Sequence, residues 1–323
     1  MRALLVIRPS SLGDIVHSLS LVSDVAAQRP DFAVDWVAEE GFVPLVRLDA
    51  RVRHVIPVAF RRWRGAPLAR GTWHEFADFR HALRAQRYDC IIDLQEQVKG
   101  ALIARLARGR RHGFDRHSIR EPIATALHDT HHRIERAQHF IDKARALAGA
   151  ALGYVPGGPP RWQWSLPAPP PTMPAERYAL LFHGTSRADK QWPEAHWRAL
   201  IAHLSTAGIR SLLPWGSEEE RARSVRLAAG AARADVPPRQ DLPALAALAR
   251  HAELVVGVDT GLTHLSAAIG TPTVAIFTTT DAALAGVARD GPHAVDLGGN
   301  GVVPAVADVI TAAGALLRAA PHC

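Results

Sequence analysis

Three short segments of the chain carry side chains that could handle a proton or an anionic ligand. The first is a Pro-Ser-Ser-Leu-Gly-Asp run that ends at Asp14, near the start of an expected helix. A carboxylate there either caps the helix, whose N-terminus favours negative charge, or acts as a general base. The spacing alone favours the cap. The run lacks a G-x-G-x-x-G pattern, which argues against a dinucleotide site.

The second segment, residues 183–193, places Thr185, Ser186 and Lys190 between an apolar run and Pro193. Hydroxyl groups and an ammonium group donate hydrogen bonds to phosphate oxygens. Only three of the 38 basic residues are lysines, and this one follows the end of an expected strand. A polar surface loop is the alternative, but we favour a phosphate site.

The third segment reads Asp-Thr-Gly-Leu-Thr-His and opens another expected helix. Backbone amides at a helix start bind anions, and the threonine hydroxyls add donors. A carboxylate does not favour phosphate, so we expect the aspartate to accept from sugar hydroxyls. A single histidine in such a place is more often structural. The candidates here are Asp259, Thr260, Gly261, Leu262, Thr263 and His264.

Basic residues also cluster after an expected strand, where Arg61, Arg62 and Arg64 surround a tryptophan. Guanidinium groups bind phosphates or hold carboxylates in bidentate fashion, although most such runs are solvated loops. Residues 93–99 leave the next strand in the same direction. The histidines at 128, 131, 132 and 139 match no metal-site spacing, and Cys90 and Cys323 form no C-x-x-C pair, so we expect no metal.

These segments need a scaffold of alternating strands and helices. Apolar runs predict strands at residues 3–8, 32–38, 54–60, 88–94, 178–183, 209–215, 254–259 and 272–277. Helical spacing, proline and glycine signals predict intervening helices, among them 75–86 and 261–269, and a last one from about 303 to 320. This alternation predicts an α/β fold with parallel sheets.

A proline-rich stretch divides the chain. Residues 152–176 contain eight prolines and three glycines, a composition that excludes a core element. We therefore expect a domain at 1–152, a linker at 153–176 and a second domain at 177–323, whose last helix could pack back on the first domain. Two such domains facing each other would bind ligands at the carboxyl ends of their strands.

Composition limits the class of protein. Of the 323 residues 48% are hydrophobic, as in a folded globular chain, and the net charge of +7 predicts acidic partners. No basic repeat with interleaved aromatic residues supports nucleic-acid binding. No run of 18 apolar residues and no secretion signal is visible, so we expect a cytoplasmic monomer that touches the anionic inner-membrane surface.

Eight segments together resemble the bacterial lipopolysaccharide heptosyltransferases of glycosyltransferase family 9, and within them the heptosyltransferase I group. They occur in family order, and they are PSSLGDIVHSL (9–19), WVAEEGF (36–42), VIPVAFRRWR (55–64), YDCIIDLQEQVKG (88–100), IREP (119–122), DKQWPEAHWRALI (189–201), LPWGSEEERA (213–222) and VGVDTGLTHLSAA (256–268). The resemblance implies a GT-B fold, two Rossmann-like domains around a central active site. It implies inverting transfer of L-glycero-D-manno-heptose from ADP-heptose to a Kdo residue of Kdo2-lipid A, without metal or cofactor.

The resemblance also implies roles for residues. Asp14 would be the general base, and Lys190, Thr185, Ser186 and the helix start at 261–263 would stabilise the departing ADP. Asp259 would hold the heptose, and Glu218 or Glu219, in a run of three glutamates, would bind the ribose. The residues implied for the acceptor are Ser11, Gly13, Arg61, Arg62, Arg64, Gln95, Lys99 and Arg120.

Two features depart from the family pattern. Thr278-Thr-Thr-Asp281-Ala replaces a Gly-Pro-Thr-Asp-Pro-like loop, and Gly184 stands where a bulkier residue is commoner. Two alternatives stay open: a heptosyltransferase II-type enzyme that adds heptose to heptose, and a non-catalytic nucleotide-sugar-binding protein. The arginine run argues against the first, and Asp14 together with Lys190 argues against the second.

Overall fold

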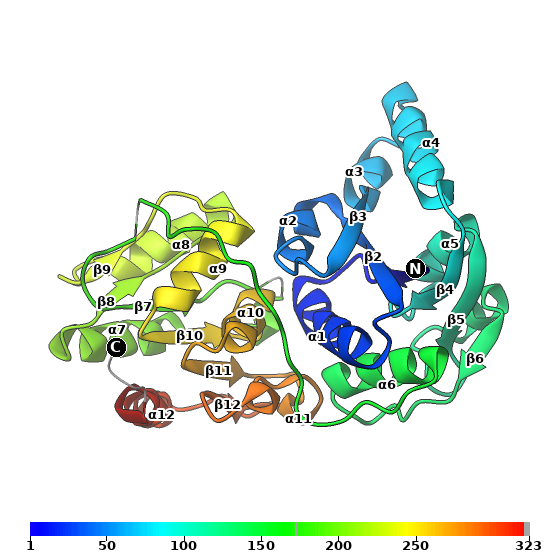
Figure 1. The fold of residues 1–323 in the computed structure, drawn as a ribbon. Coiled ribbons are helices and arrows are strands. Elements are labelled where there is room, and N and C mark those ends of the chain that lie inside the picture. The colour runs from blue at the N-terminus through cyan, green and yellow to red at the C-terminus, as the bar shows by residue number, and fades with distance from the viewer. Residues whose placement is uncertain (172, 186, 320–323) are drawn as a thin grey trace. The chain divides into compact units, whose positions relative to one another are not determined.

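The computed structural model describes residues 1–171, 173–185 and 187–319. The chain divides into two compact units, Met1–Ser165 and Leu166–Cys323, and the division falls inside the proline-rich stretch. Each unit is built on one parallel six-stranded sheet (Figure 1). The α/β class with two parallel sheets is confirmed.

The first unit has the strand order β3-β2-β1-β4-β5-β6. Its strands are β1 (Arg2–Ile7), β2 (Phe32–Glu39), β3 (Val52–Val58), β4 (Tyr88–Asp93), β5 (Gly109–Phe114) and β6 (Thr130–His132). Its helices are α1 (Leu12–Gln28), α2 (Val43–Val46), α3 (Phe60–Gly65), α4 (Arg70–Arg84), α5 (Val98–Leu106) and α6 (Phe140–Leu152), with short 3₁₀ turns η1 (Glu40–Phe42) and η2 (Pro122–Leu127).

The second unit has the order β12-β11-β10-β7-β8-β9. Its strands are β7 (Tyr178–Phe182), β8 (Arg210–Leu212), β9 (Ala234–Asp235), β10 (Leu254–Val258), β11 (Thr273–Phe277) and β12 (Ala294–Gly298). Its helices are α7 (Glu194–Thr206), α8 (Glu218–Ala228), α9 (Leu242–His251), α10 (Gly261–Ile269), α11 (Ala282–Ala285) and α12 (Val306–Ala319), with 3₁₀ turns η3 (Ala188–Lys190) and η4 (Ala288–Asp290).

Apolar sequence explains where the cores lie. The central strands β1 and β10 are buried along almost their whole length, as parallel strands covered on both faces must be. Leu5 and Ile7 belong to the core of the first unit, and Trp192 and Trp197 belong to the core of the second. Gly270, at φ +93°, adopts the left-handed conformation that ends α10.

Some elements differ from the sequence-based expectation. The strand expected at 209–215 is limited to β8, since Pro214 beyond it has no N–H to donate to a neighbour. The arginine run, for which a solvated loop was the alternative, forms the helix α3. The expected last helix is present as α12, and its described part packs on α7 and on the strands β10 to β12 of its own unit.

Candidate active site

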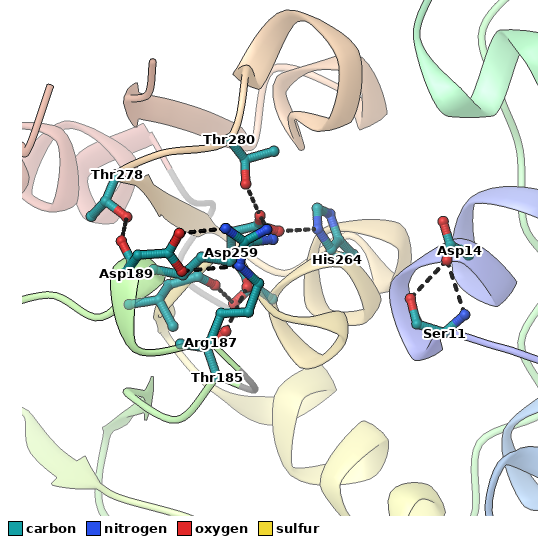
Figure 2. Close-up of polar contacts among 12 residues, drawn as sticks. Ser11, Asp14, Thr185, Arg187, Asp189, Asp259, His264, Thr278 and Thr280 are labelled. Carbon is teal, nitrogen blue, oxygen red and sulfur yellow. Dashed lines mark hydrogen bonds and ion pairs between the residues drawn. The ribbon is translucent and has the colours of Figure 1, made fainter. Parts of the chain in front are cut away.

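The first cluster of candidate side chains surrounds the start of α1, at the carboxyl end of β1. The Asp14 carboxylate accepts hydrogen bonds on Oδ2 from the Ser11 backbone N–H (2.9 Å) and hydroxyl (2.7 Å), as Figure 2 shows. Its Oδ1 forms an ion pair with Arg8 at 2.9 Å. The helix cap that the spacing favoured is present. The Asp14 side chain is 30% exposed, so a ligand can still reach it.

The loop between β4 and α5 brings two more predicted residues to this cluster. Lys99 Nζ donates to Ser10 Oγ at 3.3 Å, and Gln95 Oε1 accepts from the Ser10 N–H at 3.3 Å. Burial lowers the pKa of the Lys99 ammonium, and the charge of Arg8 lowers it further, against the opposing charges of Glu39 and Asp14. Hydrogen bonds and charges therefore connect four of the predicted residues in this cluster, Ser11, Asp14, Gln95 and Lys99.

A buried pair supports that loop from behind. Asp93 accepts from the Gln95 N–H at 2.9 Å and contacts His128 Nε2 at 3.0 Å, with both pair side chains fully buried. Gly100 is needed here, because a Cβ on it would lie 2.5 Å from the Asp93 carboxylate. His128 thus has a structural role. Among the described residues no His, Cys, Asp or Glu group is arranged to hold a metal ion.

The three arginines of α3 separate into two kinds. Arg62 bonds to Glu40 (2.9 Å) and Glu75 (2.6 Å), and these hydrogen bonds raise the pKa of its guanidinium. An acceptor would have to compete with these two carboxylates for the Arg62 guanidinium. The sequence alone did not reveal this pairing. Arg61 and Arg64 are exposed, as is Arg120 ahead of η2, and no ion pair joins any of the three to a carboxylate of the described residues.

The second cluster is centred on Asp259, at the carboxyl end of β10 (Figure 2). Lys190 Nζ lies 2.6 Å from its Oδ2, the Thr280 hydroxyl donates to the same oxygen at 2.6 Å, and His264 Nε2 lies 3.2 Å from Oδ1. Because β7, β10 and β11 are parallel neighbours, their carboxyl ends bring these side chains to one edge of the sheet.

Asp259 is ionised in this network. Its burial alone would raise the carboxyl pKa, but the hydrogen bonds and charges of His264, Lys190 and Thr280 hold that pKa well below its usual range. Lys190 is therefore the ion-pair partner of Asp259, whereas the sequence suggested a lysine that binds phosphate. Displacing it requires an anion that replaces the Asp259 contact.

The loop after β7 carries the remaining phosphate candidates. The Thr185 hydroxyl donates to the Asp259 carbonyl at 3.3 Å, and Arg187 bonds Asp189 within the loop. Ser186 lies outside the described residues. Thr278 donates to the Asp189 carbonyl at 2.7 Å and so fastens this loop to the end of β11.

Thr280 is a functional candidate that sequence reasoning missed. The loop at 278–281 was noted only as a departure from the family pattern, yet its Thr280 hydroxyl contacts the Asp259 carboxylate. The available signal was positional: the loop follows β11, the strand next to β10 in the sheet.

The start of α10 agrees with an anion site only in part. Thr260 is the N-cap residue, and its carbonyl accepts from the amides of Thr263 and His264. The helix itself leaves the amides of Gly261 and Leu262 unused. The Thr263 hydroxyl does not add a donor there, because it is fully buried and donates to the Val258 carbonyl at 2.8 Å.

The glutamates of α8 have distinct surroundings. Glu218 and Glu219 are exposed in the first turn, and Glu218 pairs with Arg221. Glu220 is half-buried and accepts from the Gly216 N–H at 2.7 Å, while its own amide is capped by Ser217. A Cβ on Gly184 would lie 2.6 Å from Glu220 Oε1, so a larger residue there would require the glutamate side chain to move. Of the three, Glu220 lies nearest the end of β7.

Known proteins resemble this chain along most of its length. Residues 76–295 match the family model described as glycosyltransferase family 9 (heptosyltransferase). A lipopolysaccharide heptosyltransferase 1 of Escherichia coli K12 is 41% identical, with 87% of this chain and 89% of the relative covered. The solved structure of E. coli heptosyltransferase WaaC with ADP superposes with a TM-score of 0.88 at 37% identity, covering 96% of this chain and 98% of that one.

A second solved structure of WaaC, with ADP-2-deoxy-2-fluoro heptose, has a TM-score of 0.84 at 36% identity over 98% of this chain and 99% of that one. These likenesses span both compact units. The chain belongs to glycosyltransferase family 9, the heptosyltransferases.

Proposed function

We propose that this protein transfers L-glycero-D-manno-heptose from ADP-heptose to a Kdo residue of Kdo2-lipid A, with inversion at the anomeric carbon. The observation that carries the proposal is the Lys190–Asp259 pair at the sheet edge of the second unit, in a family 9 chain. The relatives support the choice of substrates, since one is named a lipopolysaccharide heptosyltransferase 1 and another was solved with an ADP-heptose analogue.

Asp14 is the general base of the proposed reaction. The acceptor hydroxyl oxygen attacks C1 of the heptose, its proton passes to the Asp14 carboxylate, and the bond from C1 to the β-phosphate oxygen breaks. Ser11 and Arg8 hold the carboxylate in one orientation, which is what proton acceptance at a fixed place requires.

Lys190 and the start of α10 stabilise the departing diphosphate. The negative charge that develops on ADP attracts the ammonium away from Asp259, and the amides of Gly261 and Leu262 meet the same charge. Asp259, released from one partner and still bound by His264 and Thr280, accepts hydrogen bonds from heptose hydroxyls. Thr185 and Ser186 add hydroxyl donors, and α8 offers Glu218, Glu219 or Glu220 to the ribose.

The acceptor is held by the cations of the first unit. Arg61, Arg64, Lys99 and Arg120 present positive charge to the carboxylates and phosphates of Kdo2-lipid A, with Gln95 as a neutral donor. No described helix is long and apolar enough to cross a bilayer. We place the protein at the cytoplasmic face of the inner membrane, where a chain of net charge +7 meets a lipid-anchored, anionic acceptor.

A transfer assay tests the proposal. Purified protein is mixed with ADP-heptose and delipidated Kdo2-lipid A in the presence of a chelator, and ADP release and product mass are followed. We expect ADP release and the addition of one heptose. Transfer only to heptosyl-Kdo2 saccharide would move the assignment to a heptosyltransferase II-type enzyme. Donor binding without transfer to either acceptor would leave a non-catalytic nucleotide-sugar-binding protein.

A further inference from the structure

The junction between α3 and α4 exposes large apolar side chains. Leu68 is 90% exposed and Trp73 is 61% exposed, although most of the large hydrophobic side chains of this unit are buried. Arg64 and Arg70 flank them, and every residue from 64 to 71 is exposed. We call Arg64, Leu68, Arg70 and Trp73 the junction surface.

The junction surface is positively charged. Residues 60–84 include six arginines and two acidic residues, Glu75 and Asp78. Glu75 is already bound to Arg62. No ion pair links Arg64 or Arg70 to a carboxylate in the part of the chain that the structure describes. The two guanidiniums are therefore available to an external anion.

The junction surface belongs to the acceptor side of the first unit. α3 follows β3, and the carboxyl end of β3 lies at the same edge of the parallel sheet as the carboxyl end of β1. Arg61 of α3 is close enough to Lys99 for its charge to act on the ammonium. In Figure 1 α4 projects from the rest of its unit, so its N-terminal end is open to a large partner.

We infer that the junction surface docks on an anionic lipid bilayer, with Leu68 and Trp73 in the headgroup region and Arg64 and Arg70 against lipid phosphates. Tryptophan, an aliphatic side chain and arginines are the combination that interfacial segments use. A stable protein–protein interface buries about 800 Å² on each partner, which one leucine and one tryptophan do not supply. The inference rests on the proposed function, because a lipid-anchored acceptor is what requires the protein to approach a bilayer.

Vesicle binding tests the inference without donor, acceptor or turnover. Cosedimentation of the full chain is measured with vesicles of phosphatidylethanolamine and phosphatidylglycerol, and with vesicles of phosphatidylcholine alone. We expect binding to the anionic vesicles that weakens with salt. L68S/W73S should lower the partition coefficient about a hundredfold, and R70Q about fivefold.

Matched controls separate the surface from general charge and hydrophobicity. V155S removes an apolar side chain that is 87% exposed elsewhere in the unit, and R80Q removes an exposed arginine nearer the other end of α4. We expect V155S to bind anionic vesicles at least threefold more tightly than L68S/W73S, and R80Q at least threefold more tightly than R70Q. All four variants should keep the melting temperature of the wild type. L68S/W73S should also transfer heptose normally to delipidated Kdo2-lipid A but more slowly to acceptor embedded in vesicles.

Wild-type binding by L68S/W73S would overturn the inference, and so would equal binding of the wild type to both kinds of vesicle. A mass that rises with protein concentration in the wild type but not in L68S/W73S would replace it with self-association. If the vesicle results hold and no heptose is transferred, the docking surface stands and the proposed function fails.

Discussion

The two clusters of candidate side chains differ in how far their charges are already neutralised. In the second unit Asp259 holds Lys190, Thr280 and His264 together, so positive and negative charges are matched inside the cluster. In the first unit Asp14 pairs with Arg8, while Arg61, Arg64 and Arg120 are exposed and form no ion pair with a described carboxylate.

This difference fits two ligands of different kinds. An acceptor with many carboxylates and phosphates binds best to cations that no protein carboxylate occupies, because it need not displace an internal partner. The diphosphate of the donor gains negative charge as the bond from C1 to the β-phosphate oxygen breaks. Lys190, which is paired with Asp259, can move to that additional charge. Interactions that strengthen in the transition state are the ones that raise kcat. We therefore expect changes in the first cluster to act mainly on acceptor KM and changes in the second mainly on kcat, with Asp14 as the exception.

The largest effect is expected at that exception. D14N keeps the shape of the side chain and an oxygen for the Ser11 N–H, but it removes the proton acceptor. We expect kcat to fall about a thousandfold while ADP-heptose binds with unchanged affinity, as measured by initial rates and by calorimetry.

The control for D14N is S11A, which removes one of the hydrogen bonds to the same carboxylate and leaves the base in place. It should lower the free energy of unfolding by about 1 kcal/mol and reduce kcat far less than D14N does. If S11A and D14N were equally inactive, Asp14 would be a helix cap only.

Each unit also buries a neutral histidine, and this predicts a shared response to pH. In the first unit burial, and then the charge of His132, lowers the pKa of His112 to about 4. In the second unit burial, and then the charge of Arg223, lowers the pKa of His183 to about 4. The unfolded chain binds a proton on each near pH 6.5, where the folded protein does not. The free energy of unfolding should therefore fall as pH drops from 6.5 to 4, by roughly 3 kcal/mol for each histidine.

Urea unfolding at pH 7 and pH 4.5 measures this dependence. H183Q, which can keep a hydrogen bond to Ser224, should flatten the pH dependence, while H81Q, at an exposed position of α4, should leave it unchanged. A profile for H183Q that runs parallel to the wild type would mean that His183 is protonated in the folded state as well.

The sequence predicted the scaffold better than the state of the site. Continuous apolar runs identified β1, β4, β7 and β10, because strands covered on both faces leave no polar alternation to misread. β5 was missed, since its sequence Gly-Arg-Arg-His-Gly-Phe carries too few apolar residues to be recognised.

The site was predicted as a set of positions and not as a set of contacts. The strand ends placed Asp259 and Lys190 at one edge, but no pattern in the sequence shows that they pair. Arg62 likewise counted as an acceptor residue, although Glu40 and Glu75 come from distant positions to bind it. Thr263 resembled a ligand donor, and only the fold shows it turned inward to Val258. Contacts across 69 residues for Lys190 and across 13 and 22 residues for Arg62 decide the first two cases. The contact of Thr263 spans only five residues, and it depends on which way the side chain turns at the start of α10.

Lys190 gives a sharper test of the second cluster. K190M removes the ammonium but keeps a side chain of similar length, so Asp259 retains His264 and Thr280. We expect kcat to fall about a hundredfold and the donor KM to change several-fold at most. R187Q, in the same loop and bound to Asp189, is the matched loss of one positive charge, and its kcat should stay within a factor of three. If kcat fell equally in K190M and R187Q, Lys190 would act only through its positive charge and not through its position beside Asp259.

Lys99 gives the corresponding test of the first cluster, with the smallest expected effect. K99Q should raise the acceptor KM about tenfold and leave kcat unchanged, because the ammonium meets an acceptor anion equally in the ground and transition states.

Burial lowers the pKa of Lys99, so the acceptor KM of the wild type should begin to rise at a lower pH than that of an ordinary lysine site. K99R keeps the charge without a titration in this range, and its KM should be flat with pH. A K99Q variant with lowered kcat and unchanged acceptor KM would contradict the distinction between the two clusters, since a residue of the first cluster would then act on the transition state alone.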